Sequence, residues 1–227
     1  MMDVNKKMSR RKFLLTSAGI LGGATVLCAG GAGLAMQPVD VDMVHTSLVD
    51  KNGMGKVLVA YASMAGSTGE IAEAIGKKIN ERGVGVDVKP VAEVPDVTPY
   101  RAVVLGSPLI RSAWMEEAIS FLEAHRGTLS RLPVAYFVSC ITLAMMDNAE
   151  LRQQVNGFLD PVHAQFPEIQ PVDTGLFAGV LDFSKMPYAY RLVWPYTAGG
   201  EAKEGDYRDW NAINAWAASI TPVMVSA

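Results

Sequence analysis

KVLVAYASMAGSTGEIAEAIGKKINER, residues 56–82, is the stretch that decides the fold of this chain. Its first part, Val57 to Ala62, is short, apolar and partly β-branched, which predicts a buried strand. Small and hydroxylated residues follow at 63–68, and isoleucine then recurs every four residues from Ile71 to Ile79. That spacing predicts an amphipathic helix. The stretch therefore predicts a strand, a hydroxyl-rich loop and a helix in succession.

The loop between this strand and helix has the composition of a phosphate-binding site: Ser63-Met64-Ala65-Gly66-Ser67-Thr68. Its backbone N–H groups can turn inward, the helix contributes its positive end, and the hydroxyls add donors. It lacks both the lysine of a nucleoside-triphosphate loop and the G-x-G-x-x-G of a dinucleotide site. Such a cradle suits one terminal monophosphate, as in FMN. An ordinary strand-to-helix turn built from small residues is the alternative, although N-capping alone does not require three hydroxyls and a glycine.

The N-terminal segment has the features of an export signal. Ser9-Arg10-Arg11-Lys12-Phe13-Leu14 precedes a weakly apolar run that ends near Ala35. Paired arginines before such a run predict a twin-arginine signal, and Gly33-Leu34-Ala35 offers a cleavage site. An uncleaved membrane anchor over 13–35 is the alternative, because that run is about long enough to span a bilayer. We expect a periplasmic or otherwise extracytoplasmic protein that uses the twin-arginine translocation machinery, a route for folded and often cofactor-loaded proteins.

Composition limits the remaining choices. The chain has 227 residues, of which 50% are hydrophobic and 19% charged, enough for one packed core and unlike a disordered chain. Residues 36–227 carry 15 basic and 22 acidic side chains with no basic run, which argues against a nucleic-acid partner. They contain a single cysteine, Cys140, and the three histidines are scattered. We find no metal-ligand spacing and no acid–base dyad, so any redox chemistry would be that of a cofactor.

Strands and helices are expected to alternate after residue 56. Residues 36–55 are predicted to be a linker with at most a short extended segment, and 222–227 a tail. The expected strands are 57–62, 84–88, 102–106, 133–140 and 172–181, and the later helices are 115–125, 149–165 and 209–221. This alternation predicts an α/β fold with a doubly wound, five-stranded parallel sheet in the order 2-1-3-4-5 and helices on both faces.

The order of the sheet brings three loops to one edge. Ligands of such sheets bind beside the C-terminal ends of the strands, near the switch point between the first and third strands. The loops there are 63–68, 107–114 and 139–147. In the second loop, the predicted wall for a flavin ring consists of Ser107, Pro108, Leu109, Ile110, Arg111 and Trp114. Arg111 would stabilise negative charge on the reduced ring or attract an acidic substrate. The alternative for Trp114 is that it packs under the following helix.

The third loop is predicted to offer backbone groups to the pyrimidine edge of the flavin through Ser139, Cys140, Ile141 and Thr142. It has no aromatic residue, which would leave one ring face open to a substrate. Cys140 is expected to be a buried structural thiol rather than a redox centre.

An aromatic insertion is predicted at 182–206. It contains Tyr188, Tyr190, Arg191 and Trp194, which are candidate substrate-binding residues. Three interpretations remain open: a site for a flat aromatic substrate, a surface that docks on a membrane or quinone, and a segment that packs on the body of the domain.

Residues 56–221 resemble the flavodoxin-domain family that includes the quinone-dependent protoporphyrinogen IX dehydrogenases. Besides S-x-x-G-S-T at 63–68, the resemblance is carried by Val103–Ser107 with Ile110-Arg111, Phe177–Leu181, Pro187-Tyr188 with Tyr190-Arg191, Gly199-Gly200-Glu201, and Tyr207 with Asp209-Trp210 and Trp216-Ala217. Gly-Gly-Glu followed by Asp-Trp is the most discriminating part, because ordinary flavodoxins lack it.

The resemblance implies a flavodoxin-like fold with FMN held by the three loops and the insertion near the active site. The family reaction removes hydrogens from protoporphyrinogen and passes electrons to a respiratory quinone. This chain differs in its more acidic insertion and its export signal. We therefore expect an exported FMN-dependent oxidoreductase acting between a small aromatic or quinone-type molecule and the flavin. The alternatives are a one-electron carrier that serves another redox protein and a binding module without flavin.

Overall fold

The computed structural model describes residues 41–145, 148–186, 188–193 and 203–226. The predicted export signal, Trp194 and Gly199-Gly200-Glu201 lie outside these residues. None of the helices formed by the described residues has the length and apolar character of a membrane span.

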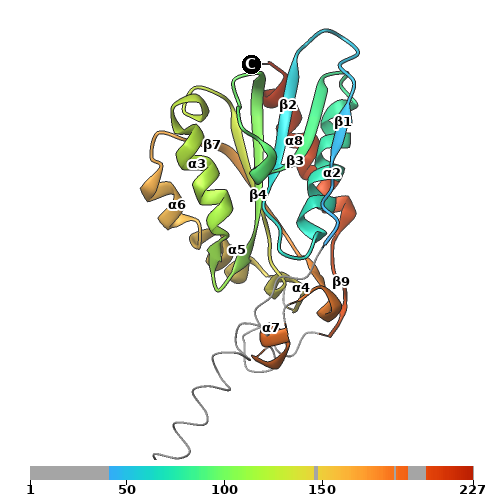
Figure 1. Ribbon diagram of the computed structural model, residues 1–227, viewed down its shortest axis with the longest axis vertical. Coiled ribbons are helices and arrows are strands. Elements are labelled where there is room, and N and C mark those ends of the chain that lie inside the picture. The colour runs from blue at the N-terminus through green and yellow to red at the C-terminus, as the bar shows by residue number, and fades with distance from the viewer. Residues whose placement is uncertain (1–40, 146–147, 187, 194–202, 227) are drawn as a thin grey trace, which may run out of the picture.

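A central sheet carries the fold (Figure 1). Its parallel strands follow the spatial order β3-β2-β4-β6-β7. Their bounds are β2 Lys56–Tyr61, β3 Gly85–Pro90, β4 Tyr100–Ile110, β6 Val134–Ser139 and β7 Pro171–Phe177. The predicted five-stranded, doubly wound sheet is therefore confirmed, as is its 2-1-3-4-5 order.

A further strand extends the sheet at the edge next to β3. β1, Thr46–Leu48, pairs with β3 in the antiparallel direction, with Thr46 opposite Val88 and Leu48 opposite Val86. The short extended segment expected within residues 36–55 is thus present, and it belongs to the sheet instead of serving only as a linker.

Helices cover both faces of the sheet (Figure 1). On one face, α2 (Ser67–Asn80) and α8 (Trp210–Ser226) bury isoleucines from both helices against β2 and β4. On the other face, α3 (Glu116–Leu129), α5 (Ala149–Gly157) and α6 (Asp160–Gln165) pack on the alternate side chains of the same strands. Burial on both faces explains the continuous apolar runs in the strand sequences.

The prediction of a loop at 107–114 is wrong, because these residues form a β-hairpin. β4 continues to Ile110, and β5 (Ala113–Trp114) turns back to pair with it. The two turn residues, Arg111 and Ser112, have φ angles of 53° and 62°. A two-residue hairpin turn of this type needs positive φ at both positions and usually uses asparagine or glycine. The Arg-Ser pair therefore gave no turn signal in the sequence.

Two other predicted elements are divided in the structure. The helix expected over 149–165 is broken between α5 and α6, where Pro161 stands in the first turn of α6. Proline lacks the N–H that a continuous helix would need there. The strand expected over 172–181 ends at Phe177, and Val180–Leu181 forms β8 of a separate ribbon with β9 (Gly205–Asp206).

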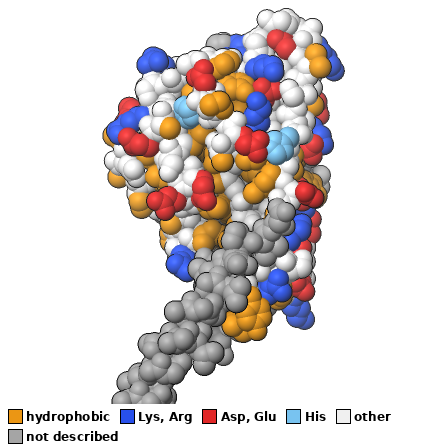
Figure 2. Space-filling model, viewed as in Figure 1, with side chains coloured by type: hydrophobic (Ala, Val, Ile, Leu, Met, Phe, Trp, Pro, Cys, Tyr) orange, Lys and Arg blue, Asp and Glu red, His pale blue; other side chains and the backbone are white. Residues whose placement is uncertain are grey.

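The short helices and the end of the last helix also differ from the sequence-based expectation. α4 (Thr142–Met145) begins the segment predicted as a loop after β6. The 3₁₀ helix η1 (Val91–Glu93) follows β3, and the insertion contains η2 (Phe183–Lys185) and α7 (Tyr188–Val193). α8 runs to Ser226, so most of the expected tail is helical. On the face shown in Figure 2, acidic and basic side chains of the described residues are interspersed.

Asp87 on β3 is a buried carboxylate with three side-chain donors. Ser47 Oγ donates over 2.6 Å, Lys56 Nζ over 3.1 Å and Tyr100 Oη over 3.0 Å. Burial raises the pKa of Asp87, but these hydrogen bonds outweigh burial and leave its pKa below the ordinary value. Because the folded pKa is depressed, the carboxylate stabilises the fold above the unfolded pKa of about 3.9.

Asp87→Asn is expected to lower the free energy of unfolding by about 1–3 kcal/mol at pH 7. The difference from the unmodified protein should shrink as pH falls from about 4 toward the lower folded pKa of Asp87, because the carboxylate of the unfolded chain is protonated first and that of the folded chain last. Urea unfolding measured at several pH values between about 3 and 7 checks this. A difference that stays constant over that range would contradict the assigned role.

Candidate functional site

The phosphate loop, residues 63–68, connects β2 to α2. Gly66 is the residue before the helix and has φ 83°, in the left-handed region. Its N–H donates to Ser63 Oγ over 2.9 Å, and its carbonyl accepts from the N–H of Gly69 over 2.9 Å. These bonds close the loop into a fixed turn at the start of a 14-residue helix.

The start of α2 fits a phosphate group. The first N–H groups of a helix have no acceptor within it, and the described residues supply none to the amides of Ser67 and Thr68. A side chain at Gly66 would be strained by its φ angle, and its Cβ would lie 2.9 Å from Val41 Cγ1. Glycine thus keeps the turn tight while two amides remain at a positive helix end, which is the arrangement that binds a monophosphate.

Thr68 joins the first and third predicted loops. Its Oγ1 lies 3.0 Å from Ser139 Oγ at the end of β6, and both side chains are buried. Next to this contact, the N–H of Ala62 donates to the carbonyl of Gly106, and the N–H of Cys140 to that of Phe177, each over 2.9 Å. The structure therefore brings residues 63–68 and 139–142 to one edge of the sheet. The Thr68 hydroxyl is engaged between the loops, while its amide stays at the helix start.

The second predicted segment is the β4–β5 hairpin. Buried Ser107 receives a hydrogen bond from the N–H of Met115 at its Oγ, over 3.0 Å, which fixes the hairpin to the start of α3. Pro108, Leu109 and Ile110 are partly buried, and Arg111 is exposed at the turn. Trp114 is buried, and its ring centroid lies 4.9 Å from that of Tyr136 in an edge arrangement. Trp114 thus belongs to the core cluster that also includes residues of α3, the following helix, and its role beside a flavin stays a prediction.

The third segment is mostly enclosed. Ser139 and Cys140 are buried, and Ile141 and Thr142 are partly buried where α4 begins. Cys140 carries a free thiol within the core cluster beside α3 and α5. The prediction of a buried thiol is confirmed.

The insertion residues are only partly described. Tyr188 in α7 is 59% exposed. Arg191 donates from Nε to the carbonyl of Met186 and from Nη2 to that of Ser184, each over 3.1 Å. Tyr190 belongs to α7, and Trp194 lies outside the described residues. The substrate role of these residues stays a prediction.

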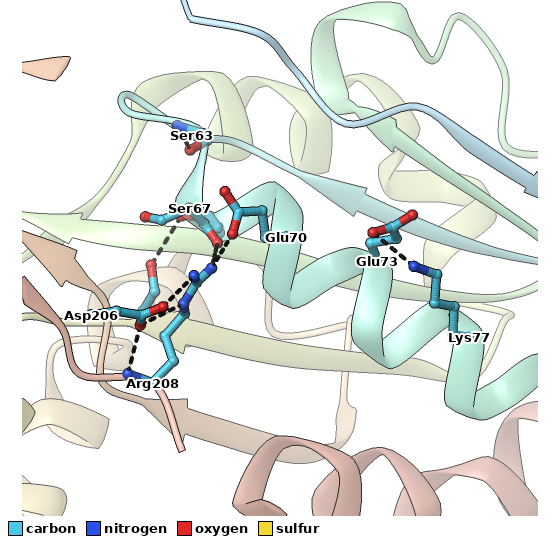
Figure 3. A network of polar contacts seen from close by, with 10 residues as sticks. Ser63, Ser67, Glu70, Glu73, Lys77, Asp206 and Arg208 are labelled. Carbon is cyan, nitrogen blue, oxygen red and sulfur yellow. Dashed lines mark hydrogen bonds and ion pairs between the residues drawn. The ribbon is translucent and has the colours of Figure 1, made fainter. Parts of the chain in front are cut away.

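An ionic cluster that sequence reasoning missed lies against the phosphate loop (Figure 3). Arg208 Nη1 lies 2.6 Å from the Glu70 carboxylate and 3.5 Å from the Ser67 carbonyl. Its Nε and Nη2 donate to both oxygens of Asp206, over 2.8 and 2.6 Å. Arg208 also holds the pKa of Asp206 below its ordinary value. Glu70 lies 138 positions from Arg208 in the sequence, which is too far for any local pattern to indicate their contact.

A family model described as "Flavodoxin domain" matches residues 58–196. The chain belongs to the flavodoxin-domain family. Protoporphyrinogen IX dehydrogenase [quinone] of Leishmania major is 25% identical to this flavodoxin-domain protein over 176 residues, covering 73% of this chain and 74% of the relative. The protein of the same name from Escherichia coli K12 is 24% identical over 175 residues, covering 73% of this chain and 94% of the relative.

Solved structures with a similar fold include flavodoxins. One from the domain Archaea is 16% identical with a TM-score of 0.43, covering 74% of this flavodoxin-domain chain and 98% of the other. The two-electron reduced flavodoxin of Megasphaera elsdenii is 16% identical with a TM-score of 0.41, covering 72% and 98%. These likenesses concern the fold alone, and the family assignment rests on the sequence match.

Proposed function

We propose that this protein is an exported, FMN-dependent oxidoreductase that passes electrons between a small aromatic or quinone-type molecule and its flavin. The observation that carries the proposal is the phosphate loop, where Gly66 in the left-handed region leaves the amides of Ser67 and Thr68 at the start of α2. Membership of the flavodoxin-domain family supports FMN as the ligand of this loop. The flavin, when bound, supplies the electron transfer.

The residues of the chain would bind and orient the flavin. The amides of the phosphate loop would hold the phosphate, and the Ser63 hydroxyl shapes the loop through its bond to Gly66. The β4–β5 hairpin and residues 139–142 would flank the ring. Arg111, exposed at the hairpin turn, would place a fixed positive charge near the ring or attract an acidic substrate.

The small-molecule partner is proposed from the relatives and the insertion. The names of the two relatives describe them as dehydrogenases and include the word quinone. Exposed Tyr188 in α7 offers an aromatic contact for a flat molecule. Docking of the insertion on a membrane stays an alternative.

Export is proposed from Ser9–Leu14 and the apolar run that follows. It implies the twin-arginine machinery as a partner and a periplasmic or extracytoplasmic location, with cleavage after Ala35 favoured over anchoring by 13–35. The mass of the protein recovered after export checks the cleavage. An intact N-terminus in a membrane fraction would support the anchor.

A second candidate function is that of a carrier with no substrate of its own, passing single electrons to another redox protein. Its support is membership of the flavodoxin-domain family.

Purified full-length protein is expected to be yellow and to release stoichiometric FMN on denaturation. The phosphate loop predicts that FMN rebinds to the stripped protein more tightly than riboflavin, which lacks the phosphate. Absorbance spectra, cofactor release and titration of both flavins measure this. Turnover with a soluble quinone would support the enzyme, and electron exchange only with a redox protein would support the carrier. Colourless protein without FMN affinity would exclude both.

A further inference from the structure

We propose that Arg208 is a positioning residue that fixes the phosphate loop and balances the negative charge beside it, so that the loop can accept a phosphate group. This inference rests on the proposed FMN function. It concerns a residue outside the three loops, on the segment that returns from the insertion.

The position of Arg208 is fixed from several sides. Its side chain is 7% exposed, and its guanidinium lies over the ring of Trp210, 4.4 Å from the ring centroid. A planar guanidinium that is stacked and bound to both oxygens of Asp206 keeps one orientation. Its remaining N–H groups therefore point toward the first turn of α2, where they reach Glu70 and the Ser67 carbonyl.

The ion pair between Arg208 and Glu70 affects how favourably a phosphate can bind at the start of α2. It stands in the first turn of α2, where a carboxylate interacts favourably with the helix dipole. The same position is unfavourable for an anion bound at that helix end, because like charges repel. Arg208 forms an ion pair with Glu70 over 2.6 Å and so offsets its charge. Without Arg208, Glu70 and Asp206 would leave two uncompensated carboxylates beside the phosphate loop.

The contact also connects the insertion with the phosphate loop. Asp206 lies in β9, labelled in Figure 1, which pairs with β8 just before the insertion and forms the last two residues of the insertion. Arg208 lies two residues beyond the end of β9 and contacts both Asp206 and the first turn of α2. The base of the insertion is thereby tied to the phosphate-binding end of the helix.

A purely structural ion pair would behave differently in a binding measurement. It would affect FMN and riboflavin alike, since both share the ring and the ribityl chain. A residue that orients the phosphate loop and balances its charge affects the ligand that carries the phosphate. The ratio of the two affinities therefore separates the two roles.

The test is titration of the stripped, full-length protein with FMN and with riboflavin. Arg208→Ala is expected to raise the dissociation constant for FMN about tenfold and that for riboflavin by less than about twofold. Arg208→Lys keeps the charge without the planar fork, so an intermediate loss for FMN is expected. Glu70→Gln keeps an oxygen that can accept from Arg208 and removes the charge, so it should leave FMN affinity unchanged or increased. Arg208→Ala with Glu70→Gln should recover only the part of the loss that comes from the uncompensated charge of Glu70.

Several results would overturn the inference. These are equal losses for FMN and riboflavin, unchanged FMN affinity in Arg208→Ala, or weaker FMN binding in Glu70→Gln. If Arg208→Ala does not fold, Arg208→Lys decides, because an unchanged ratio of affinities there also overturns the inference. Failure of the unmodified protein to bind either flavin would instead overturn the proposed function, and this inference with it.

Discussion

Gly106→Ala is expected to lower the free energy of unfolding by about 3 kcal/mol, near the upper end of overpacking effects. Gly106 lies on β4 directly opposite Phe137 on β6. The added Cβ would overlap the Phe137 ring, which crosses the glycine. Gly106 also accepts the hydrogen bond from the N–H of Ala62, so displacement of its backbone would disturb the end of β2 as well.

The Phe137 ring cannot move aside at low cost. It is fully buried, and its centroid lies 6.4 Å from that of Phe177, which in turn packs edge-on against Trp216. Protein interiors are close-packed, so a shift of one ring is passed on to its neighbours. The cost therefore includes the strain of several side chains.

Gly127→Ala is the matched control. Gly127 is an exposed residue inside α3, and an added Cβ meets no heavy atom within 4 Å. Alanine at such a helix position is expected to stabilise the fold by about 0.5–1 kcal/mol. Urea unfolding of both variants under one condition tests the pair. Equal stability of the two variants would contradict the account of Gly106.

The sequence predicted the parallel sheet because buried strands leave continuous apolar runs, such as Val57 to Ala62. It did not identify β1 as a strand of the sheet, because three residues, Thr46–Leu48, are too few to form a pattern. The β4–β5 hairpin was missed because Arg111 and Ser112 adopt positive φ without a glycine or asparagine to indicate it.

For the candidate site, the sequence predicted which loops meet but did not indicate the ionic cluster around Arg208. The rule for parallel sheets predicted that the loops after β2 and β6 meet, and the contact between Thr68 and Ser139 confirms it. Arg208 was not predictable, because it contacts Glu70 from 138 positions away. A contact over that separation depends on the packing of α8 and the β8–β9 ribbon, which no local pattern encodes.

Gly66→Ala is expected to raise the dissociation constant for FMN about tenfold or more. An alanine at the φ of 83° found here costs about 1–2 kcal/mol, and its Cβ would press on Val41 Cγ1 at 2.9 Å. The loop escapes this strain by leaving the left-handed conformation. That change would alter the direction of the N–H groups of Ser67 and Thr68, which are the proposed donors to the phosphate.

Gly53→Ala separates strain from site geometry. Gly53 has a φ of 67° with open space around it, so alanine there carries a comparable backbone cost away from the phosphate loop. Its FMN affinity should stay within about twofold of the unmodified protein, although its stability falls by about 1 kcal/mol. Equal FMN losses in Gly53→Ala and Gly66→Ala would mean that general destabilisation accounts for the effect.

Val41→Ala combined with Gly66→Ala distinguishes the two causes of strain at the phosphate loop. Truncating Val41 removes the atom that the new Cβ would meet, and leaves the unfavourable φ angle in place. Partial recovery of FMN affinity is therefore expected in the double variant, measured by the same titration. Full recovery would assign the whole effect to the steric contact, whereas no recovery would assign it to the backbone. Because Val41 precedes β1, partial recovery would also show that this segment influences the phosphate loop.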